Sequence, residues 1–479
     1  MESVIVPNVR AGYRWRNLSF VLVAALLGYA AVLFIPAVLN DPDTYWHIET
    51  GRWILEHQAV PRADPFSFTM AGHPWVAHEW LSEALMALAY RTLGWNGIVM
   101  LYGAAAATTS GCLAQYLARR MPPVAAAFTL TLATACVSSS LLARPHLLVL
   151  PLLVLWTIGL LRAQETRGPP SWRLLPLMLI WANSHASFVL GLVLIVPLGI
   201  DALMQAKHDA RRIARDWILF LAAALATALV TPHGWYGLLF PFQLGSLHLV
   251  ASIGEWRPFD LYSPEPIEAA LAALLYVVVS RRVRVSMPRL LILGGLLYLA
   301  YRHSRHEMLA GIVGAAVLAE PLGRTLGPIP PATDSGRMPP REIAVGLACA
   351  ALLTVLRLVY PVERGDGPIS PMAALASVPA NLLNTPVFNG YEFGGYLIFK
   401  HVRPFIDGRA DMYGDDFVSA YLGAARPDRA AFERLVKEYR IRWALLATRS
   451  AAAEMISALP GWRRVRTDDV AVVLVRDGP

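Results

Sequence analysis

Two carboxylates stand close together directly after the first long apolar stretch of the chain. Residues 40–54 read NDPDTYWHIETGRWI, so Asp41 and Asp43 flank a proline and His47 follows four residues later. A charged side chain at the edge of a bilayer is costly unless it is solvated, paired or used. A carboxylate is also a common general base for activating a hydroxyl group. These residues therefore predict chemistry at a membrane face.

We expect Asp43 to be the base and Asp41 to be its partner or positioner. Pro42 predicts an extended backbone before the helical pattern, and Asp43 then stands where its side chain could cap that helix. The simpler alternative is that both aspartates serve only as capping and loop residues. His47 is the third catalytic candidate, and its simpler alternative is an interfacial position.

The composition predicts a polytopic α-helical membrane protein. Of 479 residues, 56% are hydrophobic and 16% are charged, and the mean hydropathy is +0.46. Soluble proteins carry about 25% charged residues, and a membrane-spanning helix needs about 20 mostly apolar ones. We predict about eleven spans, at residues 18–39, 96–117, 123–143, 146–162, 172–184, 187–206, 217–231, 266–280, 288–301, 307–322 and 342–360.

The positive charges predict the orientation of these spans. The net charge of +8 is not a nucleic-acid signal, because the basic residues fall in short clusters between apolar stretches. Lys and Arg are enriched in cytoplasmic loops. Because successive loops lie on alternate sides of the membrane, the cytoplasmic segments would be the N-terminus, Arg119–Arg120, Arg162–Arg173, Lys207–Arg215, Arg281–Arg289 and Arg324–Arg341. This predicts a cytoplasmic N-terminus and an extracytoplasmic C-terminus.

Two regions outside the spans are long enough to fold. The first outside loop, residues 40–95, contains two helical patterns at Thr44–His57 and Trp80–Leu93. We predict that both helices lie in the membrane interface, with four tryptophans as headgroup-level anchors: Trp46, Trp53, Trp75 and Trp80.

The composition changes after residue 360, which divides the chain into a transmembrane domain (1–360) and an extracytoplasmic α/β domain (361–479). Strand-like runs PVFN, PFID, WALLA and VAVVLV alternate with helical patterns at Asp428–Tyr439 and Ala451–Leu459. Three polar residues follow PFID: Asp407, Arg409 and Asp411. Turn chemistry explains them most simply, and acceptor recognition is the function that we would expect of them.

Unusual polar residues of the membrane half gather at helix ends on the predicted outer side. Arg and His hold phosphate oxygens through charge-assisted hydrogen bonds. We therefore predict donor-phosphate binding by Arg144, His185, Arg302, Arg305 and His306, and substrate positioning by His78, Glu79, Asn183 and His233. Headgroup contacts of the arginines and interhelical hydrogen bonds of Asn and His are the alternatives.

Several short stretches resemble the GT-C superfamily of polytopic membrane glycosyltransferases. They are DPDTYWHIETGRWIL after the first span, WANSHASFVLG, TPHGWYGLLFP, RHSRHE, NGYEFGGYLIF and FIDGRADMYG. The resemblance implies a bacterial inner-membrane enzyme that uses a polyprenyl-phosphate-linked sugar donor. It also implies an essential acid in the first outside loop, which here is Asp41 or Asp43. The chain departs from the pattern in its Asp-Pro-Asp sequence, where some members carry an Asp-Glu pair.

The sequence thus favours a glycosyltransferase of cell-envelope polysaccharide synthesis, acting on a glycan, lipid or protein acceptor. No cofactor is required, although Asp-x-Asp could also hold a divalent cation. Membrane lipids are expected partners and nucleic acid is not. One alternative is a transporter or flippase of lipid-linked glycans, which would need polar residues at mid-membrane depth rather than at helix ends on one side. The other is a non-catalytic membrane scaffold.

Overall fold

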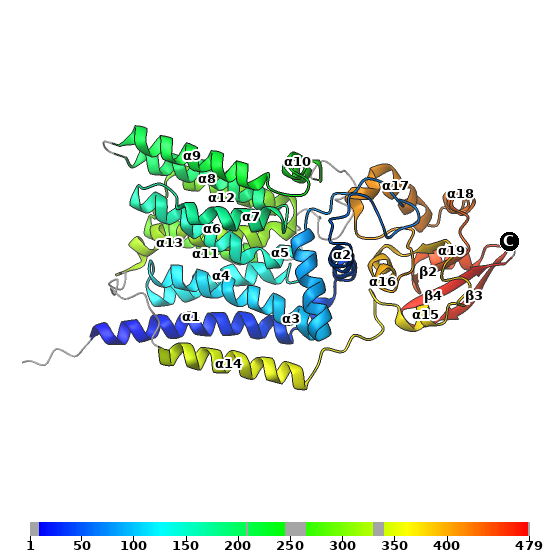
Figure 1. Cartoon of the computed structure of the whole chain (residues 1–479). Helices are drawn as coiled ribbons and strands as arrows, with labels where there is room; N and C mark the ends of the chain where they lie inside the picture. The colour runs from blue at the N-terminus through cyan, green and yellow to red at the C-terminus, as the bar shows by residue number, and fades with distance from the viewer. Residues whose placement is uncertain (1–8, 207–208, 245–264, 329–339, 478–479) are drawn as a thin grey trace, which may run out of the picture.

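The computed structural model describes residues 9–206, 209–244, 265–328 and 340–477. A bundle of helices and a smaller C-terminal α/β part lie end to end, and α1 begins at the end of the bundle far from the C-terminal part (Figure 1). Residues 207–208 and 329–339, which belong to two predicted cytoplasmic segments, lie outside the described residues.

Each predicted apolar stretch overlaps one helix of the bundle. These helices are α1 (Val9–Phe34), α3 (Trp80–Ala118), α4 (Pro123–Ser138), α6 (Leu150–Thr166), α7 (Leu175–Ala182), α8 (Phe188–Met204), α9 (Ala210–Ala228), α11 (Pro266–Arg281), α12 (Met287–Arg302), α13 (Glu307–Leu326) and α14 (Pro340–Val359). Among the described residues, three helical segments are long and apolar enough to cross a membrane: Trp80–Ala118, Ser304–Leu326 and Pro340–Val359. The count of about eleven spans therefore stays a prediction.

The shortest helix of the bundle is α7. Its 8 residues cover only about 12 Å, well below the thickness of a bilayer core. Pro176 lies in its first turn, where the missing N–H interrupts no intrahelical bond. A single turn of 3₁₀ helix, Trp172–Leu174, precedes it. The proline therefore starts α7 instead of kinking a longer helix.

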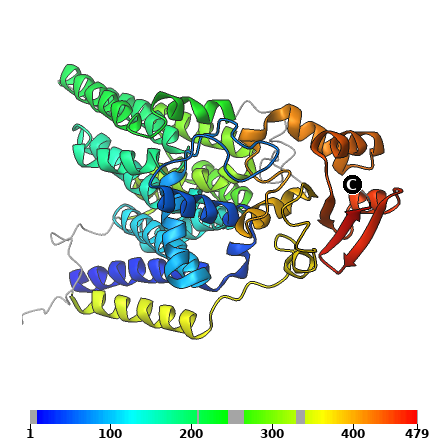
Figure 2. The same ribbon diagram turned by 45° about the vertical axis from the view of Figure 1, so that its right-hand side comes forward.

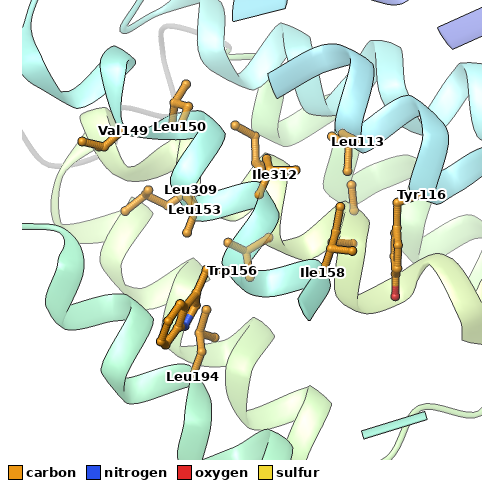
Figure 3. Packing of buried hydrophobic residues seen from close by; sticks show 14 of the residues in the cluster. Leu113, Tyr116, Val149, Leu150, Leu153, Trp156, Ile158, Leu194, Leu309 and Ile312 are labelled. Atoms are coloured by element: carbon orange, nitrogen blue, oxygen red, sulfur yellow. The ribbon is translucent and has the colours of Figure 1, made fainter. Parts of the chain in front are cut away.

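The interior of the bundle is a continuous apolar core. Figure 3 shows Leu153 and Trp156 of α6 beside Leu194 of α8 and Leu309 and Ile312 of α13. The indole of Trp156 donates a hydrogen bond to the carbonyl oxygen of Gly191 at 2.8 Å, so its one polar group is satisfied. This packing holds α6, α8 and α13 in fixed relative positions.

An ionic network lies at the end of the bundle far from the C-terminal part. The guanidinium of Arg289, buried at the start of α12, contacts Asp201 at 3.2 Å, Glu320 at 2.8 Å and the Gln164 side chain at 2.9 Å. Arg289 belongs to the segment Arg281–Arg289, which the sequence predicts to be cytoplasmic. Gln164, Asp201 and Glu320 are far from Arg289 in the sequence, so only the packing of α6, α8, α12 and α13 reveals the network.

The first loop forms one helix of its own, α2 (Asp43–His57), which lies between the bundle and the C-terminal part (Figure 1 and Figure 2). It contacts α3 on one side and α16 (Gly394–Phe399) on the other. Trp46 and Trp75 are only 7% and 5% exposed and pack with Ile398. The prediction of an interfacial helix with these two tryptophans as headgroup anchors was wrong, because the C-terminal part covers them.

The second predicted interfacial helix is continuous with the next span. It forms the first turns of α3, which bends where Leu93 and Gly94 leave the helical conformation. Gly94 has a φ of 57°, a value that favours glycine, so the bend has a local cause in the sequence. Two short helices, α5 (Pro145–Leu148) and α10 (Trp235–Leu244), lie at the same end of the bundle as α2 (Figure 1).

The C-terminal part contains a four-stranded sheet of order β1-β2-β4-β3. Its strands are β1 (Val387–Asn389), β2 (Trp443–Ala447), β3 (Trp462–Thr467) and β4 (Ala471–Arg476). The β1–β2 pair is parallel and the β2–β4 and β3–β4 pairs are antiparallel. Around the sheet lie α15 (Met372–Ala376), α16, α17 (Ala410–Ala425), α18 (Arg429–Tyr439) and α19 (Ala451–Ser457).

One strand prediction in this part was wrong, and one strand was not predicted. The PFID run is a loop that crosses the core, where Phe405 and Ile406 are fully buried. The Asn389 side chain accepts the N–H of Phe405 and donates to the carbonyl oxygen of Ile406, so it replaces a strand neighbour. Strand β3, read as WRRVRT, was missed because three of its six residues are arginines, which suit its place at the sheet edge.

A buried arginine joins the first loop to the C-terminal part. Arg409 is 2% exposed, and its guanidinium lies 2.7 Å from Asp64 of the first loop and 2.7 Å from Asp407. The Tyr413 hydroxyl donates to Asp407 at 2.7 Å. One arginine thus neutralises two buried carboxylates from distant parts of the chain.

Arg409→Met is expected to lower the free energy of unfolding by about 3–5 kcal/mol, because it leaves two buried carboxylates without a counterion. Thermal unfolding of the purified protein in detergent measures this effect. The matched control is Arg429→Met, which removes an exposed pair with Glu433 and is expected to cost less than about 1 kcal/mol. Equal losses in the two variants would contradict the structural role of Arg409.

Candidate active site

Asp41 and Asp43 have different tasks at the start of α2. An oxygen of the Asp41 carboxylate accepts the backbone N–H of Asp43 at 2.7 Å. Pro42 has φ −65° and ψ −28°, a helical conformation. The expectation of an extended backbone at Pro42 and of capping by Asp43 was therefore wrong. Asp41 binds the free N–H at the helix start, which leaves the Asp43 side chain to face elsewhere.

Arg144, just before α5, bridges the two carboxylates. Its Nε lies 2.7 Å from Asp41 and its Nη2 lies 2.5 Å from Asp43. Asp41 is 1% exposed and Asp43 is 8% exposed. Asp43 lines a cavity at this end of the bundle, whereas Asp41 lies behind it. Arg144 was predicted to hold the donor phosphate, and its guanidinium also orients both aspartates.

The surroundings of Asp43 suit a general base. Burial raises the pKa of Asp43 from 3.8 to about 6, although the charge of Arg144 opposes the shift. A base is most effective when its pKa lies close to the operating pH. Asp43 is therefore ionised at neutral pH and still basic enough to accept a proton from a hydroxyl group as that group reacts.

The cavity that Asp43 lines has a volume of about 680 Å³ and collects most of the predicted site residues. They come from the first loop, from α5, from the α7–α8 junction and from the α12–α13 junction. The predicted residues in its lining are Asp43, His47, His78, Glu79, Arg144, His185, Arg302, Arg305 and His306. These side chains are far apart in the sequence, so the fold alone brings them together.

Glu79 is the centre of a histidine cluster within this cavity. Its carboxylate lies 3.4 Å from His185, 3.5 Å from His78 and 3.8 Å from His47. Burial alone would raise the pKa of Glu79, but the histidines, His78 foremost, lower it below its ordinary value. Burial likewise opposes protonation of His78, yet Glu79 raises the pKa of His78 above 6.5. Glu79 and His78 thus form a partly buried ion pair.

The other two histidines of the cluster are neutral. Burial lowers the pKa of His47 to about 3 and the pKa of His185 to about 4, and in both cases outweighs the attraction of Glu79. His47 is 3% exposed and its Nδ1 lies 3.1 Å from Glu83. Neutral imidazoles at these positions can exchange hydrogen bonds without adding charge, which fits positioning better than proton abstraction by His47.

Glu79→Gln is expected to lower the free energy of unfolding by about 2 kcal/mol at pH 6. The loss should be smaller at pH 8. A His whose folded pKa is raised contributes stability that is complete below the unfolded pKa and disappears as pH rises through the folded pKa. Thermal unfolding at both pH values tests this, with Glu56→Gln at an exposed position as the control. Equal losses at pH 6 and pH 8 would contradict the His78–Glu79 ion pair.

The α12–α13 junction supplies the positive charge. Helix α12 ends at Arg302, and a turn of 3₁₀ helix, Ser304–His306, leads into α13. Arg302, His303, Arg305 and His306 all line the cavity, and His306 Nδ1 lies 3.3 Å from the carbonyl oxygen of Leu299. Two guanidinium groups at one wall of a cavity are suited to binding phosphate oxygens.

Two predicted positioning residues lie outside this cavity. The Asn183 side chain accepts from the indole of Trp80 at 2.8 Å and donates to the carbonyl oxygens of Leu179 and Val230. His233 Nε2 lies 3.2 Å from the carbonyl oxygen of Ala77. The contacts of Asn183 match the alternative of interhelical hydrogen bonding, and His233 holds the first loop in place.

The C-terminal part completes the cavity wall, and of its lining residues only Asp411 was named from the sequence, as a candidate for acceptor recognition. Tyr391, Glu392, Gly408, Ala410 and Asp411 also line it. The signal was present in NGYEFGGYLIF and FIDGRADMYG, whose polar residues flank glycines.

These glycines allow the C-terminal part to lie directly on the two-aspartate motif. A Cβ at Gly408 would lie 1.8 Å from the Asp43 carboxylate, and a Cβ at Gly395 would lie 2.2 Å from the carbonyl oxygen of Pro42. No real Cβ makes such a contact, so only glycine permits this approach at either position. The stretches DPDTYWHIETGRWIL, NGYEFGGYLIF and FIDGRADMYG therefore meet at one point.

Asp41 and Asp43 share one cationic neighbour. Within residues 9–206, 209–244, 265–328 and 340–477, no group of three or more His, Cys, Asp or Glu side chains is placed to hold a metal ion. Both aspartates instead contact one guanidinium, which supplies positive charge between them.

Comparison with known proteins identifies similar folds but no similar sequences. No family model and no curated protein matches the chain. A crystal structure of ArnT from Cupriavidus metallidurans bound to undecaprenyl phosphate is similar with a TM-score of 0.52 and 14% identity, covering 96% of this chain and 99% of that one. The Archaeoglobus fulgidus oligosaccharyltransferase in its apo form has a TM-score of 0.50 and 13% identity, covering 90% of this chain and 69% of that one. The same enzyme tethered to an acceptor peptide with the NVT sequon has a TM-score of 0.51 and 12% identity, covering 91% of this chain and 69% of that one.

Proposed function

We propose, from the premise that the chain has the GT-C fold, that it is a membrane glycosyltransferase. It moves a sugar from a polyprenyl-phosphate-linked donor to an acceptor at the outer face of the inner membrane. Asp43 is the base, and Arg302 and Arg305 bind the donor phosphate. Undecaprenyl phosphate, which is bound in the ArnT structure, is the lipid that we expect to carry the donor sugar.

The observation that carries this proposal is the two-sided lining of the cavity. One side carries Asp43, the Glu79 cluster and the arginines of the α12–α13 junction. The other side carries apolar residues from α6, α8, α12 and α13, among them Leu150, Leu153, Leu190, Leu299 and Leu309. A molecule that fills both sides has a long apolar chain joined to an anionic, polar head, as a polyprenyl-phosphate sugar does.

The reaction follows from the positions of these groups. The acceptor oxygen attacks the anomeric carbon of the donor sugar, and the bond between that carbon and the phosphate oxygen breaks. Asp43 takes the proton of the acceptor hydroxyl, and the polyprenyl phosphate departs with the bonding electron pair. Arg302 and Arg305 stabilise the negative charge that develops on the departing phosphate. Asp41 and Arg144 keep the Asp43 carboxylate in place throughout.

The acceptor side of the site is the wall built by the C-terminal part. Glu392 and Asp411 line the cavity beside Gly408, which touches Asp43. Carboxylates accept hydrogen bonds from sugar or other hydroxyl groups, so they can hold an acceptor with one hydroxyl directed toward Asp43. Burial raises the pKa of Asp411. We assign acceptor binding to these two residues.

The proposal is tested by reconstituting the purified protein in liposomes that contain undecaprenyl-phosphate-linked sugars with a labelled sugar unit, together with a panel of glycan, lipid and protein acceptors. A panel of hexose, pentose and amino-sugar donors covers the unknown sugar. We expect the label to leave the lipid, with free undecaprenyl phosphate released in equal amount, only with the active protein. If the label crosses the membrane while still bound to its lipid, the protein is a flippase and the proposal is wrong.

Binding of the donor phosphate by Arg305 can be tested with a matched pair of variants. Arg305→Gln removes a cation from the cavity, whereas Arg324→Gln removes one from the far end of α13, where the side chain is 74% exposed. Arg305→Gln is expected to slow transfer by roughly 10²-fold, because it removes one stabiliser of the departing phosphate. Arg324→Gln is expected to leave the rate unchanged. Equal rates in the two variants would contradict phosphate binding by Arg305.

A further inference from the structure

A second cavity lies in the C-terminal part, away from the proposed active site. It has a volume of about 900 Å³ and is bounded by α18, by the loop before β1, by the α19–β3 turn and by the ends of β2 and β4. Figure 1 and Figure 2 both place α18 and β3 at the side of the C-terminal part turned away from the helical bundle. A ligand of this cavity is therefore not a headgroup of the bilayer that surrounds the bundle.

The lining of this cavity carries an excess of positive charge. Lys437, Arg440, Arg442 and Arg476 all contribute to it. In the part of the chain that the structure describes, no acidic side chain forms an ion pair with any of these four residues. The one acidic residue of the lining, Glu433, pairs with Arg429 at 2.7 Å. None of the four cations thus has an ion-paired carboxylate among the described residues, and an anion in the cavity would supply a counterion.

Two of these arginines are neighbours on adjacent strands of the sheet. The β2–β4 register pairs Trp443 with Val475, so Arg442 and Arg476 stand opposite each other, and the backbone N–H of Arg476 donates to the carbonyl oxygen of Arg442 at 2.9 Å. Like charges directly opposite in an antiparallel pair are destabilising. Two guanidinium groups side by side also form a suitable clamp for a carboxylate or a phosphate.

An aromatic wall stands beside the arginines. Trp462 and Phe432 line the cavity with their ring centroids 5.5 Å apart, and the Trp462 side chain is partly exposed. The indole offers a rigid, flat apolar face at low conformational cost, as in many sites that bind polar ligands with one apolar side. The faces of sugar rings have this character, and a cavity of about 900 Å³ is large enough for several sugar units.

We propose that this cavity is a binding site for an acidic oligosaccharide. A sugar ring stacks on Trp462, and the carboxylate or phosphate substituents of the glycan bind Arg442, Arg476 and their two neighbours. The site binds the glycan without changing it, so this inference does not depend on the proposed transferase activity. In a glycosyltransferase it would hold a growing or finished anionic chain at a distance from the reacting end.

The test measures binding of tetragalacturonate to the full-length protein in detergent, with the neutral tetrasaccharide maltotetraose beside it. We expect tetragalacturonate to bind and to raise the unfolding temperature, and we expect its affinity to fall as salt is added. Arg442→Gln with Arg476→Gln should weaken this binding by roughly tenfold or more, since charge-assisted hydrogen bonds are lost.

The matched control is Arg463→Gln with Arg464→Gln, which removes the same charge from β3 outside the cavity lining. It should bind tetragalacturonate as the unchanged protein does. The proposal is overturned if the two double variants bind equally, if maltotetraose binds as tightly as tetragalacturonate, or if inorganic phosphate competes as well as the glycan. The salt dependence and the thermal shift of the unchanged protein keep the test decisive should a variant fold poorly.

Discussion

Asp43→Asn is expected to slow sugar transfer by roughly 10²–10⁴-fold, the usual contribution of a general base. An asparagine has the shape of an aspartate but cannot take the proton of the acceptor hydroxyl. The fold should persist, because Arg144 keeps its contact with Asp41 and the helix cap does not involve the Asp43 side chain. The rate is measured as label released from undecaprenyl phosphate under saturating donor.

The matched control for this variant is Asp41→Asn. Asn caps helices as well as Asp does, so the bond to the Asp43 N–H can persist while one charge beside Arg144 is lost. We expect a smaller loss of rate, because Asp41 lies behind the cavity and acts only through Arg144 and the start of α2. If Asp43→Asn is normally folded and retains full transfer activity, Asp43 is not the base.

The rate should also fall as the pH is lowered through about 6. Burial raises the pKa of Asp43 to about 6, with Arg144 opposing the shift and Asp41 and Asp407 adding to it. The base works only when ionised, so the rate of the unchanged protein should drop about tenfold for each pH unit below 6. An aspartate at the ordinary pKa of 3.8 would keep its rate to about pH 4. A flat rate between pH 7 and pH 5 would contradict the role of Asp43.

Most helices of the bundle could be predicted from the sequence, because apolar helices are recognised by their local composition. Every predicted apolar stretch contains a helix, and even Pro176, which made one stretch doubtful, has a local explanation at the start of α7. Local composition also predicts a division of the chain at residue 360. It was misleading only where an apolar run crosses a core as a loop, as at Phe405 and Ile406.

Contacts between distant segments could not be predicted in the same way. Trp46 and Trp75 are typical of headgroup anchors, and only packing with distant residues such as Ile398 and Met412 makes them core residues. The polar side chains of the cavity could be grouped at one end of the bundle from the order of the spans. Which of them face the cavity depends on the conformation of the turns between helices, so Asn183 and His233 could not be separated from His78 and Glu79.

Gly408→Ala is expected to reduce sugar transfer by roughly 10²-fold while leaving the protein folded. The added methyl group would lie 1.8 Å from Oδ1 and 2.6 Å from Cγ of Asp43, so the carboxylate must move. A displacement of about 1 Å in a reacting group can cost this much in rate. The backbone of Gly408 itself tolerates a side chain, since its φ is not among the positive values of the chain.

The matched control is Gly423→Ala in α17, in the same part of the molecule. There the new methyl group would lie 3.7 Å from Ala431, an ordinary contact, and alanine favours the helix. Comparing transfer rates and unfolding temperatures of the two variants separates displacement of Asp43 from damage to the C-terminal part. A Gly408→Ala protein with unchanged rate would show that the C-terminal part does not position Asp43. A reduced rate at normal stability would identify the segment FIDGRADMYG as one wall of the catalytic site.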